Sequence, residues 1–262
     1  MVIAGSRSFI AAVFLLIVRL AWPPTKAGKN PRFPFWACAI AYAFTLLTYV
    51  IANKLTTAAN VILLQYGAPI WAALLGWALA KEKPNWEHWL ALLFVMGGLL
   101  LFFRDGLSPG ALYGNLLAIF SGILLGAHSV FLRMMKEGNP IDALLLGHVI
   151  TAVLSVPFIF MYPPSLKASS LFSILFMGIF QMGLASLLFS NGIKRISAIQ
   201  AMLTAIADPI LNPVWVLLIT GERPSIHALL GGAVIITAVV ASSLIHNSKL
   251  NTQRREEHKG GG

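Results

Sequence analysis

The chain has 262 residues, of which 58% are hydrophobic and only 11% charged, and its mean hydropathy is +0.80. Soluble domains carry about 25% charged residues, so this composition excludes an ordinary soluble domain. The net charge of +10 lies mostly in short gaps between apolar blocks, which favours a role in membrane topology and no nucleic-acid partner. The single cysteine, Cys38, excludes a disulfide or a thiolate metal site within one chain.

Nine apolar blocks of roughly the length needed to cross a bilayer follow one another along the chain. Turn signals rich in Pro and Gly separate them. The last residues, 247–262, are polar and basic, and we expect a mobile tail there. The sequence thus predicts an all-α integral membrane protein embedded in lipid, with crossings at 3–22, 35–53, 59–79, 86–103, 112–132, 140–162, 171–190, 196–219 and 226–246.

Lysine and arginine are distributed unequally between the two sides of this arrangement. Fourteen of the 19 lie in one set of alternate gaps and five in the other. Because cytoplasmic loops carry the excess of positive charge, the asymmetry predicts a multi-pass protein of the cell membrane with a cytoplasmic C-terminus. Residues 247–262 are then a cytoplasmic basic tail.

The chain resembles itself when it is shifted by 140 residues without gaps. In such an apolar sequence, matches between apolar residues are expected by chance. Matched prolines and a repeated Glu-x-Pro are not expected by chance. We therefore interpret the pattern as an internal duplication. The informative pairs are Pro23-Pro24 with Pro163-Pro164, Lys54 with Lys194, Pro69 with Pro209, Glu82 with Glu222 and Pro84 with Pro224.

The shift maps the first four blocks onto the last four and leaves 112–132 without a partner, since the partner would lie before Met1. The natural unit is then five helices, and an odd unit inverts the second copy. Inverted repeats are typical of secondary transporters. We expect a first repeat at 1–106 with four helices, a second at 107–246 with five, and one N-terminal helix fewer than the duplication implies.

Two stretches resemble the EamA-type half-domain of the drug/metabolite transporter superfamily. They are Ala59 to Trp71 with Glu82-x-Pro84, and Gln200 to Pro209 with Glu222-x-Pro224. The resemblance covers nearly the whole chain. It implies ten helices in two inverted five-helix repeats, a central substrate cavity, and export or uptake of small metabolites. In the family the first helix, absent here, helps to line the cavity.

Asp208 is the strongest single candidate for function, because charges inside the bilayer usually face a cavity or a partner. It directly precedes Pro209, and its repeat mate is Ala68, so the shared fold does not require the charge. It could carry protons or bind a cationic substrate, or it could cap the helix break at the proline. Asn212, four residues later, shares its helical face.

The prolines Pro69 and Pro209 each remove a backbone donor within a block, which predicts a pair of broken helices. The alternative is a packing kink satisfied by neighbouring helices. In the predicted crossing 59–79, which contains Pro69, Asn60 and Trp71 share one helical face, whereas Gln65 lies roughly 140° from Asn60 around the helix. The candidates for lining the cavity are Asn60, Gln65, Tyr66, Trp71, His128, Asp208 and Asn212.

Other polar residues carry weaker signals. His128 and His148 could relay protons or be hydrogen-bonded packing elements, and Gln181 and Asn191 are weaker candidates still. The setting of Arg7 depends on the absent helix. Glu82 and Glu222 are expected in structural ion pairs, and Gly122-x-x-x-Gly126 is either a homodimer face or ordinary helix packing.

The leading hypothesis is a secondary transporter, an exporter or permease, that moves a small organic metabolite by alternating access. No phosphate-binding loop is present, so we expect neither ATP drive nor any cofactor. A facilitator or exchanger without proton coupling is the rival within transport. A membrane-embedded enzyme and a non-transporting remnant are the rivals outside it, and the motifs of hydrolases and metalloproteases are absent.

Overall fold

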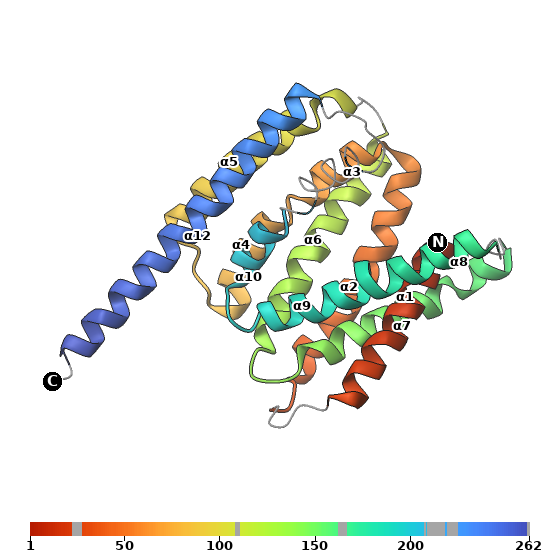
Figure 1. Ribbon diagram of the computed structural model, residues 1–262, viewed down its shortest axis with the longest axis horizontal. Coiled ribbons are helices and arrows are strands. Elements are labelled where there is room, and N and C mark those ends of the chain that lie inside the picture. Colours follow the sequence, from red (N-terminus) through yellow and green to blue (C-terminus); the bar gives the residue numbers. More distant parts are fainter. Residues whose placement is uncertain are drawn as a thin grey trace.

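The computed structural model describes residues 1–22, 28–107, 111–161, 167–206, 208, 218 and 225–260. This part of the chain folds into helices, with no strand among the described residues (Figure 1). The elements are α1 (Val2–Ala21), α2 (Arg32–Leu55), α3 (Ala58–Gln65), α4 (Ala68–Ala80), α5 (Trp86–Phe102), η1 (Arg104–Gly106), α6 (Leu112–Met134), α7 (Pro140–Met161), α8 (Ala168–Phe176), η2 (Met177–Leu184), α9 (Ala185–Gly192), α10 (Ala198–Ala205) and α12 (Ile226–Gly260).

Six helical stretches are long and apolar enough to cross a bilayer, and two shorter apolar helices, Trp86–Phe102 and Ile226–Ser242, accompany them. The chain is therefore a multi-pass membrane protein, as the sequence predicts. Of the predicted crossing 196–219, the structure describes α10 and two single residues further on. The six long stretches are Val2–Ala21, Arg32–Leu55, Ala58–Ala80, Leu112–Met134, Pro140–Met161 and Ala168–Gly192.

The third crossing is broken where the sequence places its proline. Helix α3 ends at Gln65 and α4 begins at Ala68, with Pro69 in the first turn of α4, where a missing amide hydrogen is tolerated. Helix α10 ends at Ala205, the repeat mate of Gln65. Both copies of this helix therefore stop after eight residues at the same register.

The two short helices also begin in the same way. The Thr57 side chain caps α3 by accepting a hydrogen bond from the Asn60 amide at 3.2 Å. Its repeat mate Ser197 caps α10 and accepts from the Gln200 amide at 3.4 Å. Such caps satisfy amides that the first turn leaves without a partner, so local sequence fixes both helix starts.

Two elements differ from what the sequence suggested. Residues 177–184, in the middle of the predicted crossing 171–190, form a π-helix, which the hydrophobic pattern does not reveal. Helix α12 is also longer than the crossing predicted from the sequence, because it continues to Gly260 instead of ending near residue 246. Residues 247–259 contain no proline or glycine and several strong helix formers, so nothing in them stops the helix.

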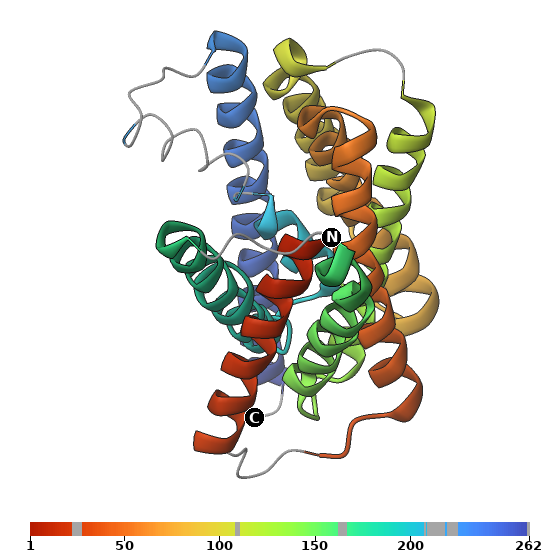
Figure 2. The same ribbon diagram turned by 90° about the vertical axis from the view of Figure 1, so that its right-hand side faces the viewer.

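Helices of one half pack against helices of the other half in the pattern that a duplication predicts. Helix α1 packs against its repeat mate α7, as Figure 2 shows, and α5 lies beside its mate α12 along one edge of the molecule (Figure 1). Likewise α2 packs on α7, while η2, its counterpart, packs on α1. This reciprocal pattern is what a two-fold relation between the halves produces.

Helix α6 lies against α2, α3 and α4, and glycines allow its close approach. A Cβ on Gly122 would come within 2.9 Å of the Gln65 carbonyl oxygen, and one on Gly126 within 2.7 Å of the Ala68 carbonyl oxygen. The Gly122-x-x-x-Gly126 pair therefore serves packing inside the chain and is not a free homodimer face. Cys38 on α2 is fully buried, and its thiol lies 3.6 Å from the carbonyl oxygen of His128 on α6.

Two ion pairs join the halves at one end of the bundle, which we call the basic end because Arg19, Arg133 and Lys194 lie there. Arg19 Nε donates to Asp142 Oδ1 at 2.9 Å, tying α1 to α7. Arg133 Nε donates to Glu82 Oε1 at 2.6 Å, and Arg133 Nη1 also donates to the carbonyl oxygens of Ile193 and Lys194. Glu82 thus has the structural ion pair expected for it, while Glu222 lies outside the described residues.

Candidate functional site

A cavity of about 500 Å³ lies between the two halves of the bundle. Its volume falls within the range of roughly 300–1,000 Å³ usual for small-molecule sites. Its walls come from α2, α4, α6, α7, η2, α9 and α10, so residues far apart in sequence meet there. The lining is largely apolar, with polar groups from Tyr42, Tyr66, His128, Gln181, Ser186 and Asp208.

The α3–α4 break and the C-terminal end of α10 border this cavity. Tyr66, Ala68 and Pro69 line it at the α3–α4 break, and Ala205, the last residue of α10, lines it from the other repeat together with Asp208. A broken helix leaves backbone groups without intrahelical partners, and such groups occur in membranes where they face a cavity or protein.

A hydrogen-bonded cluster of three side chains, two of which line the cavity, lies at its wall. The Tyr42 hydroxyl lies 3.2 Å from His148 Nε2 and 3.4 Å from the Ser186 hydroxyl, and His148 Nε2 lies 3.2 Å from that same Ser186 hydroxyl. The three residues come from α2, α7 and α9. These hydrogen bonds join three helices at the cavity, while His148 Nδ1 is buried and has no hydrogen-bond partner among the described residues.

His128 sits between two aromatic rings. Its ring centroid lies 5.1 Å from that of Tyr42 and 5.8 Å from that of Phe189, while Nδ1 is 3.0 Å from the Leu125 carbonyl oxygen. Nε2 is buried and has no hydrogen-bond partner among the described residues. His128, a candidate from the sequence, therefore lines the cavity with one nitrogen left over for a ligand or a proton.

Three other sequence candidates face α6 instead of the cavity. Asn60 lies 3.4 Å from Asn115, Gln65 donates to the Ser121 hydroxyl at 2.7 Å, and Trp71 packs on Gly126. All three partners belong to α6, so these side chains hold that helix in place. Of the remaining candidates, Tyr66, Pro69, His128 and Asp208 line the cavity, while Asn212 and Pro209 lie outside the described residues.

The sequence analysis missed Tyr42 and Ser186 as cavity residues. A usable signal was present, because each is polar where its repeat mate is apolar. Tyr42 pairs with Met182 and Ser186 with Leu46 under the 140-residue shift. The same argument that singled out Asp208 applies to them. His148 and Gln181, weighed only as weak candidates, also take part in the site.

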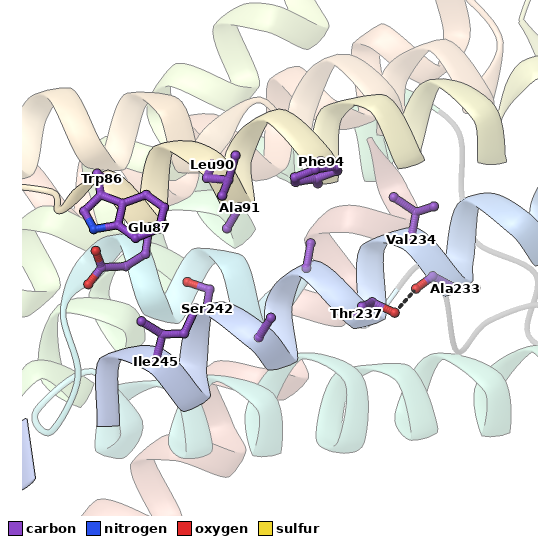
Figure 3. A pocket seen from close by; sticks show the side chains of 12 residues that line it. Trp86, Glu87, Leu90, Ala91, Phe94, Ala233, Val234, Thr237, Ser242 and Ile245 are labelled. Carbon is purple, nitrogen blue, oxygen red and sulfur yellow. Dashed lines mark hydrogen bonds between the residues drawn. The ribbon is translucent and has the colours of Figure 1, made fainter. Parts of the chain in front are cut away.

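A second hollow of about 440 Å³ lies between α5 and α12 (Figure 3). Small residues of α12 such as Ala233 and Ser242 face larger ones of α5 such as Leu90 and Phe94 across it. The Thr237 hydroxyl, which also lines it, donates to the Ala233 carbonyl within its own helix. This groove takes residues from two helices only, so we favour the central cavity as the functional site.

The comparisons with known proteins agree with this architecture. The model of the EamA-like transporter family matches the chain in two successive stretches, residues 1–104 and residues 112–244. The chain belongs to the EamA-like transporter family. This assignment confirms the resemblance stated from the sequence.

Among EamA-type relatives, the chain is 24% identical to the uncharacterized transporter YwfM of Bacillus subtilis strain 168, over 82% of this chain and 75% of that protein. It is 25% identical to the uncharacterized transporter YdfC of the same organism, over 81% of this chain and 71% of that protein. The EamA family and these names indicate a membrane transporter rather than an enzyme.

A solved crystal structure of a protein has the same fold, with a TM-score of 0.78 at 21% identity over 93% of this chain and 87% of that chain. At this identity, the likeness extends to the fold alone. The arrangement of the EamA helices described here is therefore one that occurs in a crystal structure.

Proposed function

We propose that this protein is a secondary transporter of the cell membrane that moves a small organic metabolite by alternating access. The observation that carries the proposal is the central cavity, whose walls come from both halves and which the α3–α4 break and the end of α10 border. A site shared by two repeats changes its access when one repeat rocks against the other. The cavity thus has the location that this mechanism requires.

The ion pairs of the basic end fit the same mechanism. Arg19–Asp142 and Arg133–Glu82 each connect the predicted first half with the predicted second. Opening the cavity toward the basic end would separate these partners. We therefore infer that they close this end in the state described, and that they exchange with contacts at the opposite end during the cycle.

Reconstitution tests the transport function directly. The full chain in liposomes is loaded with an extract of small metabolites, and the compounds lost to or gained from the medium are identified by mass spectrometry. A transporter releases specific compounds at a rate above that of protein-free liposomes and shows counterflow when the same compound is present outside. Absence of specific flux for every compound in the extract would contradict the proposal.

Coupling to protons is proposed at Asp208, the carboxylate at the cavity. Replacement by asparagine, Asp208→Asn, keeps the size of the side chain and removes its charge. Proton-coupled transport predicts loss of flux driven by a pH gradient, with exchange retained. If gradient-driven flux survives the replacement, the protein is a facilitator or exchanger with respect to this carboxylate.

The proposed orientation places the basic end and the C-terminus in the cytoplasm. Reporter tags at Lys54 and Lys194, which are repeat mates, should then lie on opposite sides of the membrane, with Lys194 inside. Tags on the same side would contradict the inverted relation between the halves. Export is the proposed direction, tested by comparing metabolites inside and outside cells with and without the protein.

A further inference from the structure

Helices α5 and α12 touch at a pair of glycines and separate from there toward one end. A Cβ on Gly98 would lie 3.0 Å from the Gly231 carbonyl oxygen, and one on Gly231 would lie 2.5 Å from the Gly98 carbonyl oxygen. Small residues allow such a close approach of two helices. The groove of about 440 Å³ lies to one side of this contact, between residues 86–94 of α5 and 233–245 of α12 (Figure 3). It is therefore a wedge that opens toward Trp86.

The open end of this α5–α12 groove lies at the surface of the membrane. Trp86 is the first residue of α5, and Glu82, four residues earlier, pairs with Arg133 at the basic end. Trp86 is 62% exposed, and tryptophan is enriched at the boundary between lipid and water. Leu90 and Phe94, further along the groove, are exposed as well. The groove thus runs from the boundary toward the middle of the bilayer along a surface that faces lipid.

Two buried polar side chains line this otherwise apolar groove at its open end. Glu87 is 2% exposed and Ser242 is 6% exposed, and Figure 3 shows them on facing helices beside Trp86. Asn85 Nδ2 donates to Glu87 Oε1 at 3.2 Å, and a carboxylate can accept several hydrogen bonds. The Ser242 hydroxyl forms no hydrogen bond with another described residue, whereas the Thr237 hydroxyl donates within its own helix. Because a buried polar group without a partner is costly, the groove offers these groups to a ligand.

The shared fold does not require these polar groups. Under the 140-residue shift, Ser242 pairs with Phe102 and Glu87 pairs with His227. At the opposite end of the same two helices, His227 Nδ1 lies 3.0 Å from Asp105 Oδ1, so the counterpart of Glu87 has its partner inside the chain. A small hydroxyl in place of a phenyl ring also leaves more room. The wedge with its carboxylate is therefore an addition at one end alone.

Positive charge lies just outside the groove. Lys81 and Lys83 are exposed in the segment that leads into α5. A carboxylate inside the opening and lysines outside it match a head group that carries charges of both signs. A phospholipid with an ammonium group and a phosphate has such a head group, and its acyl chain suits the apolar wedge.

We propose that the α5–α12 groove binds one phospholipid with a primary ammonium head group, of the phosphatidylethanolamine type. The ammonium donates hydrogen bonds to the Glu87 carboxylate and the Ser242 hydroxyl, and an acyl chain lies in the wedge against Leu90 and Phe94. Hydrogen bonds between charged groups are about twice as strong as those between neutral ones. The lipid joins the first half to the second, away from the central cavity, so the inference does not depend on what the cavity transports.

A competition between head groups tests the proposal on the full-length protein in detergent. The protein is incubated with equal amounts of phosphatidylethanolamine, phosphatidylcholine and phosphatidylglycerol that carry identical acyl chains, and native mass spectrometry identifies the lipid that stays bound. Phosphatidylcholine has no N–H to donate, and phosphatidylglycerol has no ammonium. We expect phosphatidylethanolamine to be retained about tenfold more than either, the ratio that one charge-assisted hydrogen bond supplies.

Replacing Glu87 should remove this preference while leaving the groove open. Glu87→Gln keeps the size of the side chain and removes its charge, so the three lipids should be retained to similar extents. Asp105→Asn is the matched control, because it removes the same charge beside His227 at the other end of α5, and it should keep the preference. Should Glu87→Gln fail to fold, Ser242→Ala removes the second polar partner and should weaken the preference.

Filling the groove should reduce retention of all three lipids. Ala241→Phe adds a ring to an exposed residue that lines the groove, and retention should fall about tenfold, because each buried methylene of the chain adds to the binding. Val240→Phe is the control, since Val240 is 50% exposed and lies outside the lining, and it should bind lipid as before.

Several outcomes would overturn the lipid site. Equal retention of the three lipids would indicate unspecific lipid around the protein, and a preference for phosphatidylglycerol would indicate Lys81 and Lys83 alone. Retention of no lipid, or a preference that survives in Glu87→Gln, would also contradict the proposal. A lipid-free dimer that dissociates in Ala241→Phe would show that a second copy of the chain occupies the groove instead.

Discussion

Helix α2 and the segment α8–η2–α9 occupy equivalent positions in the two halves, because the 140-residue shift maps one onto the other, yet they are used differently. In the most apolar 18-residue window, 44% of Arg32–Leu55 is buried, against 17% of Ala168–Gly192. Helix α6 covers α2. Among the described residues no helix covers the equivalent face of its counterpart.

The two segments also differ in how much they contribute to the cavity, and here the less buried segment contributes more. From α2, only Tyr42 lines it, whereas the counterpart supplies a whole wall. Helix α2 is therefore mostly packed against other helices, whereas its counterpart lines the cavity and contains a π-helix. The residues of that wall are Phe180, Gln181, Met182, Ala185, Ser186 and Phe189.

The largest expected effect is a loss of stability, caused by a substitution in α6 where this helix packs against α4. Gly126→Val would bring a side chain into contact with the Ala68 carbonyl oxygen and Trp71, both within 2.8 Å of the added Cβ. Overpacking of this kind costs about 1–3 kcal/mol, so thermal denaturation in detergent should shift down by several degrees. Gly97→Val is the control, since no atom lies within 4 Å of its added Cβ. Equal melting of the two variants would contradict the scaffold role of α6.

The second largest loss of stability is expected when Arg133, which joins α6 to the end of α9, is replaced. Arg133 extends from α6 to Glu82 and to the carbonyl oxygens of Ile193 and Lys194 just beyond α9. Arg133→Gln should lower the free energy of unfolding by about 1–2 kcal/mol, since charged hydrogen bonds and buried acceptors are lost together. Arg19→Gln breaks a more exposed pair and should cost less than about 1 kcal/mol. A larger loss for Arg19→Gln, measured by denaturation, would reverse this order.

A change on the cavity side should affect transport more than stability. Gly178→Ala places a Cβ 2.6 Å from Ile10 atoms and so pushes η2 away from α1. Misplacing groups of the cavity wall by a fraction of an ångström lowers turnover, here by about tenfold, and the crowding should also lower the melting temperature, by less than Gly126→Val does. Gly192→Ala, with no atom within 4 Å of its added Cβ, should keep full flux in liposomes. Unimpaired flux in Gly178→Ala would remove the functional role of the π-helix.

The smallest effect is expected at a contact outside both regions. Hydrogen bonds from Ser225 and His227 lower the pKa of Asp105 below its ordinary value of 3.8. A lowered pKa adds stability that is present above the ordinary value and disappears as pH falls through the lowered one. Asp105→Asn should therefore melt slightly below the wild type at pH values above 3.8, and the difference should shrink as the pH falls further below that value. A gap that widens at low pH would contradict this assignment.

Much of the fold could be predicted because its signals are local. The apolar blocks, Thr57 and Ser197 as helix caps, and the break before Pro69 all depend on nearby residues. The π-helix could not be predicted, since it depends on how Gly178 and Gly183 meet α1, which no periodicity records. The helical continuation of α12 was missed because polarity was interpreted as mobility.

The site was harder to predict than the fold for a related reason. Asn60 and Gln65 look like cavity residues in a membrane helix, but their partners on α6 lie 55 and 56 positions away in sequence. Polarity alone does not distinguish a side chain that binds a ligand from one that binds a neighbouring helix. Comparison with the repeat mate is more informative, since Tyr42, Ser186 and Asp208 all replace apolar residues in the other half.

The burial of Cys38 makes the protein well suited to site-directed labelling. It is the one cysteine of the chain, its side chain has no exposed surface, and its thiol faces the His128 carbonyl oxygen. Water-soluble maleimides should therefore leave the native protein untouched. A new thiol introduced at Phe180, which is exposed and lines the cavity, would be the sole reactive group, so its alkylation rate from either side of the membrane would report which way the transporter faces.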